Sequence, residues 1–414
     1  MLLSFSVTNF KSFKDEAVLD LHAASIDEFK DINTFEDEKE QQVLKGLFVF
    51  GPNSAGKSNL LKGINYMRNI VLLSFVDDTL LEKLSAKQKM YFLLDKKSPE
   101  LPIKFECEFK TNKYYRYSFS IFNNKIFSEK LETKTDRYSL LFERDENKQI
   151  KGNSKFVSKI NKFINNVRDN ALIVSVLTAL NDEDLIDVSK WFKNIIFIDG
   201  RNPHRLDLDQ LKNNLEYVKC ADKTICDVST KISDFTDQEI SNMKKTSGEG
   251  IPDYVWNSLK QKNNFTKHHI YNENKEIDGE IELPLDNYAS RGTVNYLLLL
   301  SPILYALKHS SLICIDEIDA GIHVSLVNNL IGMFDSIDKN PHNAQILATT
   351  HDVFLLDEDI RRDQIILVDK NVYGESEVFS LADLKGVRKR DDFLKKYLLG
   401  YYGAIPCLKD LENE

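Results

Sequence analysis

Apolar and polar residues alternate along the N-terminal segment, and the pattern changes further on. Residues 1–22 have a period of two, which predicts two strands joined by a turn at 11–14. Residues 23–42 are acidic and polar without periodicity, so they predict a loop. Residues 44–50 form an apolar run typical of a buried strand. The apolar residues after Ser58 then recur at helical spacing (Leu60, Leu61, Ile64, Met67 and Val71). A strand–loop–helix unit is therefore predicted here.

Strand and helix patterns follow one another along the middle of the chain. Residues 103–109 and 114–122 alternate with a period of two and predict a β-meander. From about residue 150 to 265, apolar residues recur at helical spacing without the sustained heptads of a coiled coil. This stretch predicts a helical insertion, and residues 247–252 are its clearest linker. Strand-like patterns resume near residue 268.

The C-terminal part combines a long helix with two buried strands. The helix follows a turn at 290–293, and Pro302 inside it predicts a kink or a break. Apolar runs at 312–315 and 345–348 predict the strands. The whole pattern predicts one domain whose two halves are separated by the helical insertion (residues 1–145, 146–265 and 266–414).

Composition narrows the class of protein. The chain has 414 residues, 42% of them hydrophobic and 29% charged, which allows two or three globular domains. It contains no apolar run of about 18 residues, and its N-terminus lacks the basic region and cleavage site of a signal peptide. We therefore expect a cytoplasmic protein without a membrane segment. The five cysteines are scattered without metal-ligand spacing, which indicates a reducing compartment and argues against zinc (Cys107, Cys220, Cys226, Cys314 and Cys407).

The charge balance argues against a general attraction to nucleic acid. The formal net charge is −9, whereas nucleic acid carries its own dense negative charge. A basic stretch at 385–396 is diluted by Asp391 and Asp392, and a solvated helix face is the favoured interpretation. Nucleic acid is thus not a favoured partner, although a local basic groove is not excluded.

A glycine-rich loop between the predicted strand and helix has the composition of a phosphate-binding loop. In the segment 51–58, Gly51 and Gly56 permit backbone conformations that turn successive N–H groups inward at a helix N-terminus. Lys57 can bridge the β- and γ-phosphates of a nucleotide, and the Ser58 hydroxyl can bind Mg²⁺. ATP and Mg²⁺ are the cofactors expected here.

Two acidic residues end the apolar strand at 312–315. Because ligands bind at the carboxyl edge of open α/β sheets, Asp316 and Glu317 are expected at the nucleotide. Asp316 would hold Mg²⁺ through water, and Glu317 would orient and deprotonate the attacking water. His351 follows the next strand and is expected to sense the γ-phosphate. The segment 290–293 opens a helix and suits a second phosphate contact, although alone it is only a helix cap.

These elements, in this order, resemble the ABC-type ATPase heads of the SMC and RecF class. The segments 5–13 and 316–323 are similar to their first strand and to their Walker B strand and D-loop. The ending 397–406 resembles a narrower group, the AAA15/AAA21-type ATPases of prokaryotic anti-phage and abortive-infection systems, with RloA-like, AbiL-type and AriA-like members. The resemblance implies an α/β fold: a mixed central sheet with flanking helices, an antiparallel β lobe and, here, the helical insertion.

The resemblance also implies a set of site residues. Asp319 corresponds to the D-loop aspartate and His351 to the switch histidine, which join Glu317 as the catalytic set. Ser58 and Asp316 would bind the metal ion. The implied nucleotide-binding residues come from the phosphate loop, the N-terminal turn and a degenerate signature motif (Asn53, Ser54, Ala55, Gly56, Lys57, Ser58, Asn59, Lys11, Ser12, Ser290 and Gly292). The signature reads Ser-Arg-Gly-Thr, and Gln88 is the candidate for the Q-loop glutamine.

In this family the signature contacts ATP that is bound by a second subunit. The resemblance therefore implies a homodimer that sandwiches two ATP molecules, or a larger oligomer, with slow and regulatory ATP hydrolysis. It further implies a sensor or scaffold in anti-phage defence, with a separate toxic effector such as a nuclease and a phage-encoded trigger. Two alternatives stay open: a RecF-like DNA-repair ATPase, and a nuclease concealed in the acidic cluster at 182–187.

Overall fold

The computed structural model describes residues 1–36, 41–87, 89–203, 206–236, 238–240, 243, 260–389 and 391–406. The chain forms two compact units. The first comprises Met1–Asn202, Tyr305–Asp319 and Val327–Glu414, and the second Pro203–Leu304 and Ala320–Leu326. Among the helices of the described ranges, none has the length and apolar character needed to cross a bilayer.

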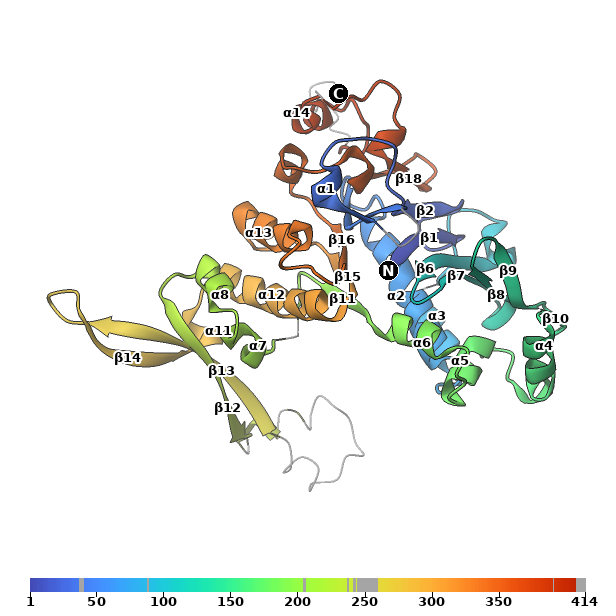
Figure 1. Ribbon diagram of the computed structural model, residues 1–414, viewed down its shortest axis with the longest axis horizontal. Helices are drawn as coiled ribbons and strands as arrows, with labels where there is room; N and C mark the ends of the chain where they lie inside the picture. The colour runs from blue at the N-terminus through green and yellow to red at the C-terminus, as the bar shows by residue number, and fades with distance from the viewer. Residues whose placement is uncertain are drawn as a thin grey trace, which may run out of the picture. The chain divides into compact units, whose positions relative to one another are not determined.

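A six-stranded sheet is the centre of the first unit (Figure 1). Its order is β11-β15-β16-β5-β17-β18; the first five strands are parallel and β18 is antiparallel. All residues of β5, β15 and β16 are buried, as expected for a parallel sheet covered on both faces. The strands are β5 (Gly46–Phe50), β11 (Ile195–Asp199), β15 (Leu312–Asp316), β16 (Gln345–Thr349), β17 (Ile365–Lys370) and β18 (Ser376–Ser380).

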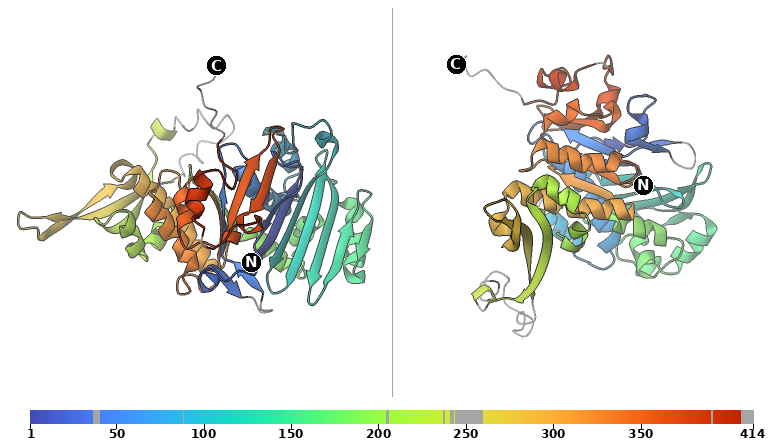
Figure 2. Two further views of the ribbon diagram at one scale, coloured as in Figure 1. Left: turned by 90° about the horizontal axis from the view of Figure 1, so that it is seen from above. Right: turned by 60° about the vertical axis from the view of Figure 1, so that its left-hand side comes forward.

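An antiparallel sheet of seven strands forms the second layer of this unit, as the turned view also shows (Figure 2). Its order is β10-β9-β8-β7-β6-β1-β2, so the predicted N-terminal strands and the predicted meander lie in one sheet. The strands are β1 (Leu2–Thr8), β2 (Ala17–Asp20), β6 (Ile103–Lys110), β7 (Tyr114–Phe122), β8 (Lys125–Lys134), β9 (Tyr138–Arg144) and β10 (Ile150–Gly152).

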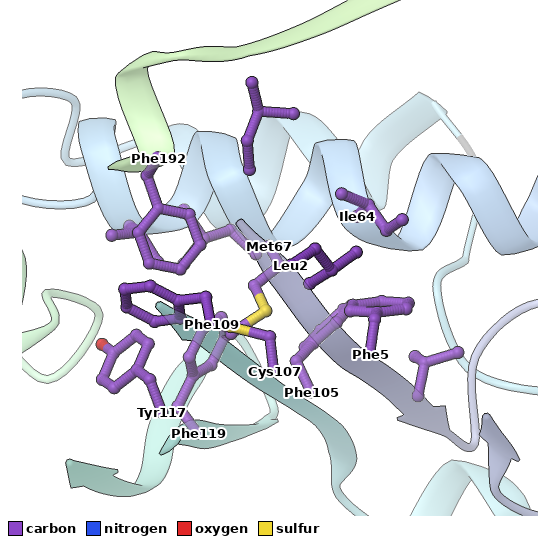
Figure 3. Packing of buried hydrophobic residues seen from close by; sticks show 14 of the residues in the cluster. Leu2, Phe5, Ile64, Met67, Phe105, Cys107, Phe109, Tyr117, Phe119 and Phe192 are labelled. Carbon is purple, nitrogen blue, oxygen red and sulfur yellow. The ribbon is translucent and has the colours of Figure 1, made fainter. Parts of the chain in front are cut away.

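Helix α2 (Lys57–Leu73) joins the two layers, because it contacts β15 and β16 of one sheet and β1 of the other. Its apolar residues Ile64 and Met67 are buried, and Phe5 lies within 3.3 Å of the Cβ that a side chain at Gly63 would have. Figure 3 shows Ile64 and Met67 facing aromatic side chains of the antiparallel sheet. This core fixes the helix that carries the phosphate loop at its N-terminus.

The predicted helical insertion, 146–265, is not one helical body in the structure. It contains the short helices α4 (Ser154–Asn161), α5 (Ile173–Ala179), α6 (Ile186–Lys193), α7 (Leu208–Lys212) and α8 (Leu215–Ala221). It also contains β10, β11, β12 and the start of β13, and residues up to Asn202 belong to the first unit. Four apolar residues at 195–198 lie in β11, between two segments with helical spacing. A run this short cannot be identified as a strand from its periodicity.

Buried Glu129 explains why part of this stretch packs on the antiparallel sheet. Its carboxylate accepts hydrogen bonds from the Tyr117 hydroxyl (2.8 Å) and from the backbone N–H groups of Ile173 (2.7 Å) and Val174 (3.0 Å). Arg144 Nη2 lies 3.8 Å from the same carboxylate, and both side chains are almost fully buried. The first turn of α5 is thereby tied to β7, β8 and β9.

The second unit contains an antiparallel sheet of three strands, in the order β12-β13-β14. These are β12 (Ile225–Asp234), β13 (Lys260–Tyr271) and β14 (Ile277–Pro284). Helices α11 (Leu285–Tyr288) and α12 (Arg291–His309) follow, with Tyr305–His309 of α12 in the first unit. Helix α12 runs on through Pro302, so the break predicted as one of two outcomes does not occur. The nearby residues Leu299, Leu300 and Ile303 are fully buried, so packing compensates for the missing N–H.

The remaining helices and strands are short. The predicted loop at 23–42 contains a helix and a small antiparallel pair of strands, α1 (Lys30–Asn33), β3 (Thr34–Glu36) and β4 (Gln42–Leu44). The other helices are α3 (Leu80–Lys87), α13 (Val324–Asp335) and α14 (Phe393–Leu398). Single 3₁₀ turns lie at Ser98–Glu100, Ile164–Asn166, Val353–Asp357, Arg362–Gln364 and Leu381–Asp383. The linker predicted at 247–252 lies outside the described residues.

Candidate nucleotide-binding site

The loop between β5 and α2 has the backbone that its glycines were expected to permit. Gly51 has φ +146° and Gly56 has φ +121°, both in a region that side-chain-bearing residues rarely adopt. A Cβ at Gly51 would lie 2.2 Å from the carbonyl oxygen of Val368, so the loop also requires glycine there for space. Helix α2 begins at Lys57, directly after the loop, and its N-terminus presents the positive end of the helix dipole.

Lys57 is folded back over this loop. Its Nζ donates hydrogen bonds to the carbonyl oxygens of Gly51 (2.6 Å) and Pro52 (3.2 Å). Burial lowers the pKa of Lys57, while the nearby carboxylates of Glu317, Asp319 and Asp316 oppose this shift. A buried ammonium that is satisfied only by carbonyl oxygens can exchange them for the stronger acceptors of an anionic ligand.

Ser12 lies against the phosphate loop. Its Oγ accepts a hydrogen bond from Asn59 Nδ2 (2.9 Å), and its carbonyl oxygen accepts one from the Ser376 N–H (2.8 Å). A Cβ at Gly56 would lie 2.7 Å from Ser12 Oγ and 2.6 Å from Ser376 Oγ. Ser376 also donates to the carbonyl oxygen of Ala55. Ser376 had no signal in the sequence, because it reaches the loop only through the pairing of β17 with β18.

Lys11 adopts φ +53° in the turn before Ser12, and its N–H donates to the carbonyl oxygen of Met90 (2.6 Å). Its Nζ lies 5.4 Å from the ring centroid of Tyr66, a residue of α2. Burial lowers the pKa of Lys11, and the charge of Lys62 lowers it further. The side chain is therefore placed along the helix that follows the phosphate loop.

Asp316 and Thr349 form a buried pair at the carboxyl edge of the parallel sheet. The Thr349 hydroxyl donates to Asp316 Oδ1 (2.8 Å) and accepts from the Glu317 N–H (2.7 Å). Asp316 is 1% exposed and Thr349 is fully buried. One hydroxyl on β16 thus orients both acidic residues that end β15. No role was predicted for Thr349, although it lies two residues before His351.

Glu317 adopts φ +57° and contacts an arginine that the sequence analysis missed. Arg201 Nε lies 3.4 Å from Glu317 Oε2 and 3.5 Å from Asp199 Oδ1. The parallel pairing of β11 with β15 sets Asp199 beside Asp316 and brings the loop after β11 to this edge. Gly200 makes the approach possible, since a Cβ there would lie 2.2 Å from the Glu317 carbonyl oxygen.

The carboxylate of Asp319 contacts the backbone of His351 within the first unit. The His351 N–H lies 3.2 Å from each carboxylate oxygen of Asp319 and donates to them. The Ile318 N–H donates to the carbonyl oxygen of Thr349 (3.0 Å), which continues the register of β15 and β16 past their ends. The imidazole of His351 is exposed. The structure thus brings the predicted D-loop aspartate to the backbone of the predicted switch histidine.

The signature residues lie in the second unit. Ser290 caps α12, because its Oγ accepts from the Thr293 N–H (3.1 Å). A Cβ at Gly292 would lie 3.2 Å from the carbonyl oxygen of Gly321, and Asn295 Nδ2 donates to the carbonyl oxygen of Ala320 (3.1 Å). The start of α12 therefore packs on the segment that follows Asp319.

Residues of two other groups noted in the sequence form ion pairs. Lys159 Nζ contacts Asp182 (2.5 Å) and Asp184 (2.8 Å), and Lys155 also pairs with Asp184, so basic residues neutralise this acidic cluster. In the basic stretch, Lys396 pairs with Asp391 (2.8 Å) beside α14. Gln88, the Q-loop candidate, lies outside the described residues.

Comparison with known proteins assigns a class. A family model described as "AAA domain, putative AbiEii toxin, Type IV TA system" matches residues 47–357, which is most of the chain. The protein therefore belongs to this family of AAA-type ATPase domains. The match runs from the strand before the phosphate loop to beyond His351, and the predicted membership and α/β fold are confirmed.

A solved structure, the SMC head domain from Thermotoga maritima, is similar to this chain with a TM-score of 0.39 and 13% identity. The similarity covers 92% of this chain and 98% of that one. No curated protein sequence matches.

Proposed function

We propose that this protein binds MgATP at the loop 51–58 and hydrolyses it slowly to ADP and phosphate. The observation that carries the proposal is the convergence of Lys57, the Asp316–Thr349 pair and Glu317 at one edge of the parallel sheet, where Lys57 experiences the charges of the acidic residues. Membership in a family of ATPase domains supports it.

The proposed roles follow from the chemistry of each side chain. The backbone of residues 53–59 cradles the phosphates, and Lys57 exchanges its carbonyl partners for β- and γ-phosphate oxygens. The Ser58 hydroxyl and the Asp316 carboxylate hold Mg²⁺, an ion that prefers oxygen ligands. Lys11 and Ser12 contribute contacts close to the phosphates.

Glu317 is the proposed general base. Water attacks the γ-phosphorus in line with the leaving ADP oxygen, and the Glu317 carboxylate accepts the proton. His351 contacts the γ-phosphate, while Asp319 holds the backbone of His351. Glu317 has a positive φ, an uncommon conformation for a residue with a side chain, and such conformations are often found at active sites.

Two chains are proposed to close on two ATP molecules, with Ser290 and Gly292 of each chain contacting the ATP of the other. The capped start of α12 supports this role, because a helix N-terminus that begins with a hydroxyl and a glycine suits a phosphate oxygen. Binding of ATP then favours the closed dimer, and hydrolysis releases it.

The protein is further proposed to act as sensor and scaffold in anti-phage defence, controlling a separate effector in response to a phage trigger. The description of the matching family names a Type IV toxin–antitoxin system, which supports this role. Large apolar side chains are also exposed along the three-stranded sheet of the second unit (Ile232, Ile270, Tyr271, Ile277 and Ile281), and such side chains suit contact with a partner.

A Glu317→Gln variant tests the nucleotide switch. It keeps the shape of the base and removes its basicity, so ATP should bind without hydrolysis and drive dimer formation, measured by light scattering with and without MgATP. Lys57→Ala in the same background is the matched control and should stay monomeric because it cannot bind the phosphates. If ATP binds to the Glu317→Gln protein and leaves it monomeric, the dimer proposal is wrong; if ATP does not bind at all, the nucleotide-site proposal fails.

A second pair of measurements separates the sensor role from a DNA-repair clamp. Purification of the Glu317→Gln protein from its native host should recover an effector protein in a defined ratio. Binding to duplex DNA should not increase with ATP. ATP-stimulated, salt-sensitive DNA binding without an effector would instead support the repair role.

A further inference from the structure

Three potential metal ligands from three neighbouring strands meet in the second unit. Cys226 lies on β12, His269 on β13 and Glu280 on β14. Their ligand atoms, one sulfur, one ring nitrogen and one carboxylate oxygen, all lie within 4.8 Å of one another. Within the described ranges, no other group of three or more such residues is this close.

Strand register explains how residues so far apart in sequence come together. His269 and Glu280 are direct cross-strand partners in the antiparallel pair β13–β14. On the other side of β13, the register of β12 shifts between Ile225 and Asp227, so Cys226 is the residue at the irregularity. Such a bulge re-aims a side chain relative to the regular alternation of a strand. Spacing in the sequence cannot reveal this arrangement.

His269 supplies a second and independent observation. Its Nδ1 is buried and has no hydrogen-bond partner. Glu280 Oε1 is the nearest carboxylate oxygen, at 3.8 Å, which is beyond hydrogen-bond distance. Buried polar atoms are almost always satisfied in folded proteins, so the orphaned nitrogen beside a thiol and a carboxylate points to a ligand at this place. A metal ion is a suitable partner for an imidazole lone pair.

We propose that Cys226, His269 and Glu280 bind one Zn²⁺ ion. Thiolate sulfur, imidazole nitrogen and carboxylate oxygen are the three ligand types that zinc takes in proteins, at bond lengths of roughly 2.0–2.3 Å. The three ligand atoms lie within 4.8 Å of one another, and a tetrahedral ion needs them somewhat closer, so the proposal requires small rotations of the three side chains. The fourth position is left for water or for a ligand from a partner.

Lys267 and His268 lie next to the three proposed ligands. Lys267 Nζ lies 3.9 Å from Glu280 Oε2, and zinc would replace this weak, partly exposed ion pair. His268 is already engaged, with Nδ1 at 3.0 Å from Thr224 Oγ1 and Nε2 at 2.9 Å from Thr266 Oγ1, so it is not a ligand. The Cys226 thiol donates a hydrogen bond to the Lys267 carbonyl oxygen, with Sγ at 3.3 Å. Binding would release the thiol proton to solvent.

The ion would link all three strands of a sheet that has little core of its own. Every residue of β14 is exposed or only partly buried, and the C-terminal half of β12 is exposed. Small structures of this kind are often stabilised by a metal ion. The inference concerns a structural site in the second unit and does not depend on the proposed ATP chemistry.

The test uses the full chain freed of metal with a chelator and then titrated with Zn²⁺ in a competing-indicator assay. One equivalent should bind, and thermal stability should rise with it. Titration with Co²⁺ should produce the charge-transfer absorption of a cobalt–thiolate bond. Cys226→Ser should abolish that absorption, and both Cys226→Ser and His269→Ala should weaken Zn²⁺ binding at least tenfold.

Matched controls identify the site. Cys220→Ser removes an exposed cysteine of the same unit and should leave both signals unchanged. Asp316→Asn removes the proposed Mg²⁺ ligand and should not alter the zinc stoichiometry. Circular dichroism of each variant without metal verifies folding. If the wild-type chain binds no stoichiometric Zn²⁺, or if Cys226→Ser binds it as tightly as wild type, the proposal is wrong.

Discussion

Arg201 Nε lies 3.4 Å from Glu317 Oε2, and the pair joins the loop after β11 to the residue that directly follows β15. Arg201 is half-exposed and Glu317 less so, so the pair adds little to the stability of the fold. Its effect is on orientation, because it fixes where the carboxylate of the proposed general base points. Strand pairing between β11 and β15 makes this contact, and Gly200 permits it.

Replacement of Arg201 by alanine should lower kcat for ATP hydrolysis and leave the KM for ATP nearly unchanged. Loss of orientation at a catalytic group costs on the order of 10- to 100-fold in rate, whereas the phosphate contacts remain. Arg201→Lys keeps the charge and should restore part of the rate. Steady-state kinetics at saturating Mg²⁺ measure both parameters. A variant with unchanged kcat would show that Arg201 does not position Glu317.

We expect Thr349 to be needed both for folding stability and for the Mg²⁺-dependent binding of ATP, because it contacts both acidic residues. Thr349→Val keeps the shape but leaves the buried Asp316 carboxylate and the Glu317 N–H without their shared hydroxyl. We expect the free energy of unfolding to fall by about 1–3 kcal/mol. We also expect Mg²⁺ to increase the affinity for ATP less than it does in the wild-type protein. Thr349→Ser, which retains the hydroxyl, is the matched control and should behave like wild type in chemical denaturation and in nucleotide titration.

The sequence predicts the features that depend on one local segment, and it misses those that depend on strand pairing. The phosphate loop, Asp316 and Glu317 are local: each depends on a short apolar strand and on the residues that directly follow it. Arg201 and Ser376 depend on which strands become neighbours in a sheet, and that pairing is not encoded in any one segment. The prediction of a helical insertion missed β11 for the same reason, since β11 is recognisable only beside β15.

Glu129 gives a test of how the antiparallel sheet holds α5. Glu129→Ala removes the acceptor for Tyr117 and for two backbone N–H groups, and it leaves Arg144 buried without its carboxylate. Loss of one member of a buried ion pair costs about 3–5 kcal/mol, so urea denaturation should show a large drop in stability. Glu129→Gln keeps one acceptor and should lose less. Equal stability of Glu129→Ala and wild type would contradict the role assigned to this carboxylate.

The carboxyl group of Asp335, at the end of α13, should make the free energy of unfolding depend on pH. Burial raises its pKa to about 6, and the Asp359 charge adds to the shift while Lys45 opposes it. The folded state therefore holds a proton that the unfolded chain, with a carboxyl pKa near 3.9, has already released. Stability from this group is fully present below about pH 4 and is lost as the pH rises toward 6. The shift of about two units corresponds to roughly 2–3 kcal/mol.

Asp335→Asn removes the titrating group and keeps its size. Its free energy of unfolding should therefore change less than that of wild type between pH 4 and pH 6.5, measured by urea denaturation at several pH values. The effect should be confined to this window, because above it the carboxylate is ionised in both states. Asp338→Asn, a neutralisation in the turn that follows α13, is the matched control and should keep the wild-type pH dependence. Parallel curves for wild type and Asp335→Asn would show that this carboxyl titrates normally in the folded protein.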